Sequence, residues 1–173
     1  GHIVFSTLHT NNAAGVIPRL IDLGVNPKIL VSALSLSIAQ RLVRKLCQFC
    51  KKENIPTEKE AKIIKLVLDS IKEEGKDLSK YNVKPSTDFK IFSPVGCEKC
   101  NNIGYKGRIG VFEAIKTDEA IEKIIPESPN EHEIKKVARS QGILSMRQDG
   151  IVKILNGITS LVEVQSVVDL NEE

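Results

Sequence analysis

Apolar residues open the chain, and the pattern then changes from strand-like to helical. Residues 2–8, "HIVFSTL", are predicted to form a buried strand that ends in the polar loop "HTNN". Residues 12–24 carry apolar side chains at helical spacing, and Gly24 stands where a helix commonly ends. Pro18 lies inside this pattern and lacks a backbone N–H, so we expect it to start, kink or split the helix.

A second helical pattern covers residues 27–39, "PKILVSALSLSIA". Pro27 suits the first turn of such a helix, where its missing N–H has no partner to lose. The next stretch, 40–46, "QRLVRKL", could continue the helix, but it leads straight into a cysteine pair. The pattern therefore favours a strand over 40–46.

One long amphipathic helix is predicted over residues 56–75. Thr57 and Glu60 have the spacing of a capping box, and Gly75 ends the pattern. The apolar stripe of this helix consists of Ile64, Val67, Leu68 and Ile71. Residues 76–96 are turn-rich with short apolar runs, which predicts one or two further strands.

The last third of the chain is predicted to be one strand followed by helices. Residues 108–115, "RIGVFEAI", have the Ile, Val and Phe content of a strand. The helices that follow have recognisable start and stop residues. These are Thr117, Asn130 with Glu133, and Ser160 with Glu163 as caps, and Gly142 and Gly157 as stops. The elements together predict an α/β fold class.

All four cysteines stand in two C-x-x-C pairs, which are Cys47 with Cys50 and Cys97 with Cys100. Two disulfides suit a small secreted domain, but no secretory signal opens the sequence and the core is too large to need them. A redox C-x-x-C motif needs only one pair. Tetrahedral zinc held by four thiolates explains both pairs at once, and it leaves no open position for catalysis. Four reduced thiols without a metal remain the alternative.

The residues around the cysteines support a metal-binding turn. Asn101, Asn102, Gly104 and Gly107 tolerate positive φ, which lets backbone amides point at sulfur. Lys51 and Lys52 would offset the negative charge of a zinc–tetrathiolate centre. The pairs are separated by residues 51–96, more than the usual spacing of about 15–20 residues, which indicates an insertion.

Composition and charge narrow the classes of function. The net charge is +3, aromatic residues make up 4% and there is no Trp, so strong nucleic-acid binding is not expected. The longest apolar stretch, "ILVSALSLSIA", is too short to span a bilayer. The chain has no initiator Met and starts with an apolar run, so we expect a fragment.

Several polar residues are candidates for chemistry. His9 follows the first predicted strand, and strand ends are where α/β sheets bind ligands. It could contact a phosphate oxygen or a water, or it could be a structural hydrogen-bonding residue, and His2 is equally ambiguous. Arg19, Arg41 and Arg44 could bind phosphate or form ion pairs. No P-loop, G-x-S-x-G, H-E-x-x-H or G-x-G-x-x-G motif occurs, so the chain alone offers no complete catalytic apparatus.

Four stretches in order carry a family resemblance. They are "GHIVFSTLHTNNAAGVIPRLIDLGV", "IAQRLVRKLCQFCK", "GCEKCNNIGYKGRIGVFEAI" and "LSMRQDGIVKILNGITSLVEVQSVVDL". Together they resemble the type II secretion and type IV pilus assembly ATPases, which are extension motors. The resemblance covers nearly the whole chain, except residues 53–90. The family's P-loop precedes the histidine box and is absent here, so the chain resembles the C-terminal portion only.

The resemblance implies a fold and an activity. The fold would be the C-terminal part of a RecA-like ATPase domain, with a tetracysteine zinc module and a C-terminal helical bundle. Its implied divisions are 1–46 for the ATPase core with the histidine box, 47–108 for the metal module and 109–173 for the helical subdomain. The parent would be a cytoplasmic homohexamer that hydrolyses ATP with Mg²⁺, and it would work on an inner-membrane platform protein. The fragment alone would be inactive.

The resemblance also implies site residues. His2 and His9 match the two histidines of the histidine box, with His9 as the better catalytic candidate. Thr10 and Asn11 accompany His9 in the motif, and Arg41 falls in the recurring "QRL" segment; these three are the candidate nucleotide contacts. The four cysteines match the family's metal site.

Two other classes of function remain open. One is a zinc-ribbon module that binds nucleic acid through Lys51, Lys52, Lys99, Lys106 and Arg108. The other is a structural interaction module that never meets nucleotide. A steep fall of DNA affinity with salt would favour the first of these.

Overall fold

The computed structural model describes residues 2–83 and 89–170. It divides into two compact units, each built from two separate stretches of the chain. The first contains 1–39 and 113–143, and the second contains 40–112 and 144–173. The described residues form two sheets of two strands each, β1 with β4 and β2 with β3.

The strand predicted over residues 2–8 is not formed. This segment has no regular secondary structure, and Ile3, Val4 and Phe5 are 88%, 81% and 95% exposed. A β-strand requires hydrogen bonds to a neighbouring strand, and neither sheet of the described residues includes this segment. An apolar, β-branched run predicts a strand only where such a partner is present.

Two short helices follow in the first unit. Helix α1 spans Val16–Asp22, so Pro18 lies in its first turn, where the backbone N–H groups have no helical partner. Gly24 follows this helix with φ +86°, as predicted. Helix α2 spans Pro27–Ala33, with Pro27 as its first residue. The helical pattern predicted over 27–39 is wrong beyond Ala33, because the chain there joins a sheet.

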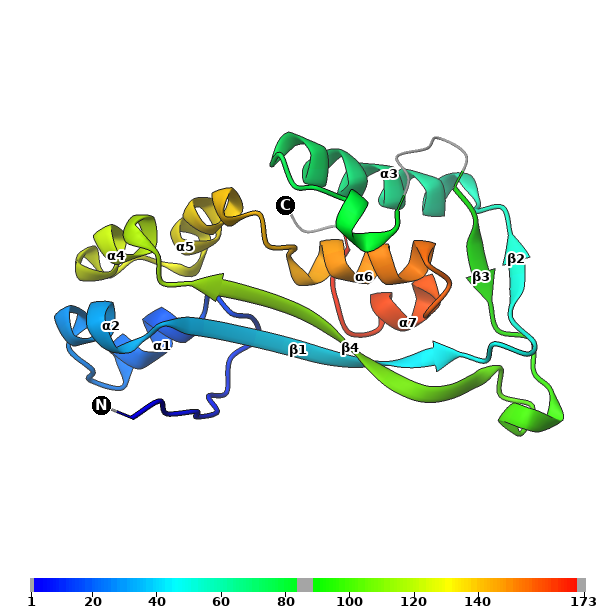
Figure 1. Cartoon of the computed structure of the whole chain (residues 1–173), viewed down its shortest axis with the longest axis horizontal. Coiled ribbons are helices and arrows are strands. Elements are labelled where there is room, and N and C mark those ends of the chain that lie inside the picture. Colours follow the sequence, from blue (N-terminus) through cyan, green and yellow to red (C-terminus); the bar gives the residue numbers. More distant parts are fainter. Residues whose placement is uncertain (1, 84–88, 171–173) are drawn as a thin grey trace. The chain divides into compact units, whose positions relative to one another are not determined.

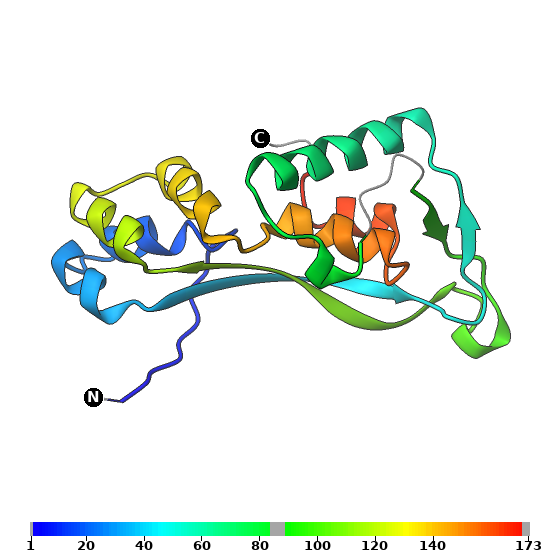
Figure 2. The same ribbon diagram turned by 45° about the horizontal axis from the view of Figure 1, so that its top comes forward.

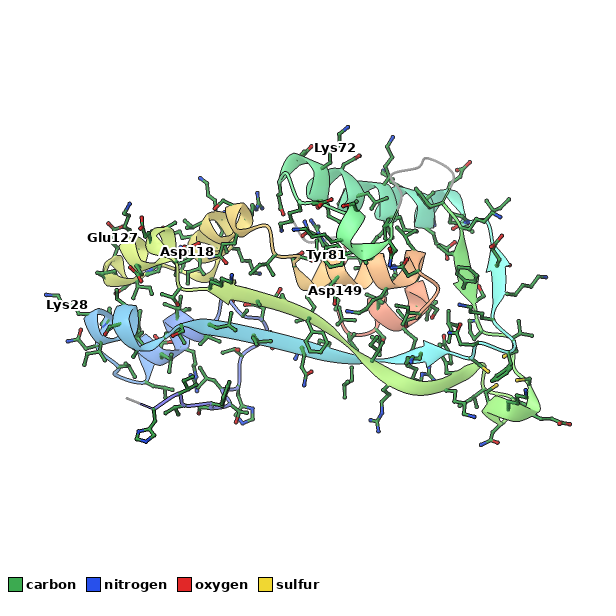
Figure 3. The ribbon with its side chains drawn as sticks, in the orientation of Figure 1. Lys28, Lys72, Tyr81, Asp118, Glu127 and Asp149 are labelled. Atoms are coloured by element: carbon green, nitrogen blue, oxygen red, sulfur yellow. The ribbon has the colours of Figure 1, made fainter. Side chains whose placement is uncertain are left out.

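Helices α4, Glu119–Ile124, and α5, Glu131–Ala138, complete the first unit. Asp118, labelled in Figure 3, caps α4 by accepting the N–H of Ile121 at 3.1 Å, so the predicted Thr117 cap is wrong by one residue. The predicted capping box at the start of α5 is confirmed. The core of this unit comprises Ala13, Ala14, Ile17, Leu30, Ile115, Ile121, Ile125 and Ile134.

Strands β1, Leu36–Leu46, and β4, Tyr105–Lys116, lie side by side and run in opposite directions in both ribbon views (Figures 1 and 2). Both predicted strands, 40–46 and 108–115, are therefore confirmed and are longer than the pattern indicated. The division between the units falls inside these strands. The second unit takes the end of β1 and the start of β4, and the cysteine turns lie there.

The predicted long helix is confirmed as α3, Glu58–Glu73, with the full capping box of Thr57 and Glu60. Its residues Ile64, Val67 and Ile71 are completely buried, and α3 packs against α6. A buried polar cluster also joins these helices. The Lys76 ammonium donates to Gln148 at 2.8 Å and pairs with Glu74 at 2.5 Å.

Strand β3, Ile91–Ser93, is one of the strands predicted over 76–96, and residues 84–88 of that stretch lie outside the described residues. It pairs antiparallel with β2, Lys52–Asn54, which the sequence did not predict because all three of its residues are polar. Among the described residues, four 3₁₀ turns complete the connections. They are η1 Ser79–Tyr81, η2 Glu98–Cys100, η3 Ile125–Glu127 and η4 Arg139–Gln141.

Helices α6, Met146–Leu155, and α7, Leu161–Gln165, belong to the second unit. The capping box predicted at α7 is only half formed. Ser160 accepts the N–H of Glu163 at 3.4 Å, but the Glu163 carboxylate binds Arg44 instead of the start of the helix. The predicted C-terminal helices thus contribute to both units, and the division at residues 46 and 108 stays a prediction. No helix within the described ranges is both long and apolar enough to cross a bilayer.

Candidate functional site

The four cysteines come together from two turns of the second unit. The first pair follows the end of β1, and the second pair brackets η2, shortly before β4. Because β1 and β4 are paired, the two turns emerge at the same end of the ribbon. The N–H of Cys47 donates to the carbonyl of Gly104 at 2.9 Å, which continues the pairing into the turns. We call these four residues, Cys47, Cys50, Cys97 and Cys100, the cysteine cluster.

The cysteine cluster has the geometry of a tetrahedral metal site. All four sulfur atoms, drawn in yellow in Figure 3, lie within 4.8 Å of one another. Three of the Sγ–Sγ distances are 3.9 Å for Cys47–Cys97, 3.8 Å for Cys50–Cys100 and 3.7 Å for Cys97–Cys100. A Zn–S bond of about 2.3 Å implies a tetrahedral edge of about 3.8 Å between sulfurs.

Disulfide pairing does not describe this cluster, because bonded sulfurs lie about 2.05 Å apart. All four thiols are free. Two cysteines from each turn therefore supply four sulfur ligands around one central position, and the cluster could hold one metal ion. The two-disulfide and single-pair redox interpretations of the sequence both fail to account for this arrangement.

Backbone amides point at the sulfur atoms, as the turn residues predicted. The N–H groups of Gly96 and Gly104 lie 3.3 Å from the sulfurs of Cys50 and Cys100, and the N–H of Cys97 lies 3.2 Å from the Cys100 sulfur. The turn that allows this uses positive φ at Gly96, Asn101, Asn102 and Gly104. Such N–H···S contacts stabilise thiolates, the form that binds metals.

The cysteines differ in acidity because they differ in these contacts. Burial acts to raise the pKa of Cys100, but the N–H groups of Cys97 and Gly104 and the neighbouring thiols outweigh it and bring the pKa to about 6. Burial raises the pKa of Cys50 to about 11, since only the Gly96 amide opposes it. Of these two thiols, Cys100 is therefore the more readily deprotonated. A cation at the centre of the cysteine cluster would favour the thiolate form of both.

The lysines around the cysteine cluster make other contacts. Lys51 donates to the carbonyl of Gly157 at 2.8 Å and lies 4.7 Å from the ring of Phe92. Lys99 lies 3.7 Å from the centroid of the Phe49 ring. Lys51 thus ties the first turn to the end of α6, and the charge compensation expected of Lys51 and Lys52 stays a prediction.

The predicted nucleotide-binding residues lie elsewhere in the chain. His2, His9 and Asn11 are exposed in the segment before α1, and Thr10 is half-buried there. Arg41 is half-buried on β1, in the second unit. The roles of all five residues stay predictions. Arg44, the neighbouring candidate, forms an ion pair with Glu163.

The segment that carries His9 ends in an ordered turn, which we call the His9 turn and which comprises residues 9–15. The Thr10 hydroxyl donates to the carbonyl of Asn12 at 3.0 Å, and the Asn12 side chain accepts the N–H of Gly15 at 2.9 Å. Two acidic residues from far along the chain, Glu113 and Glu131, also bind this turn. Sequence reasoning missed both, because no local pattern marks contacts between residues so far apart.

The geometry therefore defines two features. One is a four-thiol site of closed coordination that suits a structural metal ion. The other is an exposed histidine on a turn fixed by acidic residues. A comparison with protein families gives a match over residues 1–166 to the model described as "Type II/IV secretion system protein". The chain belongs to this family.

Curated relatives agree with this assignment. The type IV pilus assembly ATPase PilB of Pseudomonas aeruginosa is 44% identical over 96% of this chain. The type II secretion system protein E of Aeromonas hydrophila and the type II secretion system ATPase E of Vibrio cholerae are each 40% identical, again over 96% of the chain. The chain spans 27% of the first relative and 30% of the other two.

Proposed function

We propose that this chain is the C-terminal portion of a hexameric ATPase that powers assembly of type IV pili or type II secretion pseudopili. The observation that carries the proposal is the match of 96% of the chain to relatives named as pilus assembly and secretion ATPases. The parent would be cytoplasmic, would bind ATP and Mg²⁺, and would act on an inner-membrane platform protein. No role in nucleic-acid binding is proposed.

In this proposal the chain belongs to a RecA-like ATPase domain. A P-loop upstream of residue 1 would hold the nucleotide, because the chain itself contains no such motif. The exposed segment 2–8 is compatible with a strand whose neighbours belong to that upstream part. ATP hydrolysis would then require the parent, and the chain alone would not turn over ATP.

His9 would sense or position the γ-phosphate of ATP, with His2, Thr10, Asn11 and Arg41 as further nucleotide contacts. Phosphoryl transfer to water depends on positioning and charge stabilisation more than on covalent chemistry. An exposed imidazole on an ordered turn can supply a hydrogen bond to a phosphate oxygen or to the attacking water. Loss of the γ-phosphate would remove that bond and so report hydrolysis to the rest of the motor.

The cysteine cluster would hold one Zn²⁺. The metal would crosslink the end of β1 to the start of β4 and stabilise the second unit, because a closed tetrathiolate site has no position for substrate. Its role would be in folding and in contact with the platform protein or a neighbouring subunit.

The test is to express the chain with its upstream sequence and to measure ATP hydrolysis and oligomeric state. We expect Mg²⁺-dependent turnover and a hexamer, and we expect no turnover from the 173-residue chain alone. An upstream sequence without a P-loop, or a parent that binds no nucleotide, would refute the motor function. Turnover by the isolated chain would show that it contains a catalytic site of its own.

A further inference from the structure

The His9 turn is held by side chains that come from distant parts of the same unit. The Asn12 amide donates to the carboxylate of Glu131, on α5, at 2.5 Å. The N–H of Ala13 donates to the carboxylate of Glu113, on β4, at 2.6 Å. These partners are 119 and 100 residues away along the chain, so the turn takes its shape from tertiary contacts.

Asn12 is the central residue of this arrangement, because both ends of its amide are used. Its oxygen accepts the N–H of Gly15, while its nitrogen donates to Glu131. A methyl group added at Gly15 would lie 3.4 Å from the second carboxylate oxygen of Glu131, so the whole carboxylate faces the turn. The Glu131 side chain thus fixes which way the Asn12 amide points.

Packing beneath the turn leaves it little freedom. Ala13 and Ala14 are each 1% exposed and belong to one apolar cluster with Ile134 of α5. The backbone at Ala13 and Ala14 is therefore fixed by the core. The Thr10 hydroxyl, which donates to the Asn12 carbonyl at 3.0 Å, links the residue next to His9 to this fixed segment. His9 lies at the exposed end of the same turn.

Glu131 keeps the charge that this contact needs. Lys135, one helical turn further along α5, pairs with its carboxylate at 2.8 Å. The Lys135 contact, and then the Asn12 contact, hold the pKa of Glu131 below its usual range against the effect of burial. A charged acceptor makes a stronger hydrogen bond than a neutral one.

We propose that Glu131 is a positioning residue that acts through Asn12 to hold His9 in the geometry that meets the nucleotide phosphate. The inference rests on the proposed function for its phosphate partner, but the positioning itself concerns only residues of this chain. Glu131 binds Asn12 and Lys135, and none of the contacts described above joins it directly to His9. Glu131 therefore determines the orientation of the turn on which the imidazole stands, and it acts on the imidazole only through that turn.

The experiment reverses the polarity of one hydrogen bond. Asn12→Asp keeps an oxygen for the Gly15 N–H but sets a carboxylate against that of Glu131, which breaks the contact. Glu131→Gln alone weakens it by removing the charge. In the double variant, the amide group that Glu131→Gln introduces can donate to the carboxylate that Asn12→Asp introduces, so the contact is restored with donor and acceptor exchanged.

The first readout is NMR of the 173-residue chain, which contains only three histidines. We expect Asn12→Asp to shift or broaden the His9 imidazole signals and the amide signals of residues 10–15, and the double variant to restore them. The melting temperature of each variant shows that it is folded. Unchanged His9 signals in Asn12→Asp, or altered signals that the double variant does not restore, would overturn the positioning role.

The second readout is ATP hydrolysis by the parent enzyme. We expect Asn12→Asp to lower kcat by about tenfold, with KM for ATP changed by no more than about twofold, and the double variant to recover most of kcat. Glu127→Gln removes an exposed carboxylate of the same unit, labelled in Figure 3, and should leave both parameters unchanged.

The two readouts separate the inference from the function on which it rests. If wild-type parent shows no turnover, the proposed function fails, and the NMR result alone decides whether Glu131 positions His9. If the parent is active and NMR shows displaced His9 signals while kcat stays unchanged, the turn does not serve the phosphate, and the inference is wrong.

Discussion

Glu163 accepts two hydrogen bonds from Arg44, one from its backbone N–H at 3.0 Å and one from its guanidinium at 2.5 Å. The two residues are 119 positions apart, and their contact joins the C-terminal helix α7 to β1. The Arg44 guanidinium also lies 4.3 Å from the centroid of the Tyr105 ring. Tyr105 is the first residue of β4, the strand that follows the second cysteine turn. The C-terminal segment is thus attached to the strands that carry the cysteine cluster.

Replacing Glu163 should destabilise the second unit. The Glu163 side chain is only 11% exposed, whereas the Arg44 side chain is 55% exposed, so the hydrogen bond from the Arg44 N–H matters more than the solvated ion pair. We expect Glu163→Gln to lower the free energy of unfolding by about 1–2 kcal/mol. Urea denaturation of this variant and of Asp69→Asn, an exposed carboxylate on α3, measures the difference. Equal stability of the two variants would contradict the prediction.

The same contact predicts a pH dependence. The Arg44 hydrogen bond holds the pKa of Glu163 below its usual range, against the effect of burial. A carboxyl with a lowered folded-state pKa contributes stability above its unfolded pKa of about 4.3, and it loses that contribution as the pH falls through the folded pKa. The stability difference between wild type and Glu163→Gln should therefore be largest near neutral pH and shrink below about pH 4. A difference that grows with acidification would refute this.

Metal analysis should find about one zinc ion per chain, because four thiolates complete one tetrahedral site. Removing the metal with a chelator should lower the stability of the second unit, and hydrogen exchange should increase at the cysteine turns more than in α4 and α5. Cys100→Ser should have the same effect as chelation. Metal-free protein that melts at the same temperature as the purified chain would exclude a structural metal.

A side chain at Gly104 should destabilise the protein for two reasons, which are its positive φ and a steric clash. Gly107 shares only the positive φ, so a comparison of the two positions separates the two effects. Both have positive φ, +75° and +79°, but a methyl group at Gly104 would lie 2.4 Å from the Cβ of Pro94. At Gly107, chain neighbours aside, a methyl group would meet no atom of the described residues within 4 Å. We expect Gly107→Ala to cost about 1–2 kcal/mol from φ alone. Gly104→Ala should cost about 2–4 kcal/mol, because the clash adds to it.

The metal provides a second measurement for this pair. Gly104 also donates its N–H to the Cys100 sulfur, so its displacement should weaken metal binding. Competition with a chromophoric chelator should show lower metal affinity for Gly104→Ala than for Gly107→Ala. Equal affinities and equal stabilities of the two variants would show that the Pro94 contact is unimportant.

In the parent ATPase that we propose, His9→Ala should reduce ATP turnover and leave nucleotide binding largely intact. The reason is that a group positioned for the γ-phosphate or for water acts mainly in the transition state. Loss of one such hydrogen bond typically lowers kcat by about 10²–10³. Steady-state kinetics and fluorescent-nucleotide binding separate the two effects, and His132→Ala, on the exposed surface of α5, is the control. Unchanged turnover would make His9 a structural residue.

Elements with local signals were predicted best. The capping box at Thr57 and the stop at Gly75 are determined by residues a few positions apart, and both are present in the structure. The cysteine pairs were likewise predicted to meet, because their spacing and the Asn and Gly residues after them are local features. The strand predicted over 2–8 was wrong because its pattern describes a segment and not the partner that it needs.

The sequence by itself determined where α3 and α5, the helices with full predicted capping boxes, begin and which four sulfurs share a site, because these depend on neighbouring backbone groups and on the chemistry of thiols. Only the tertiary structure decided that the Glu163 carboxylate binds Arg44 instead of capping its own helix, and that Glu131 binds Asn12. A carboxylate takes whichever donors the fold brings within about 3 Å. That choice between a local and a distant partner is made by packing, which no sequence pattern records.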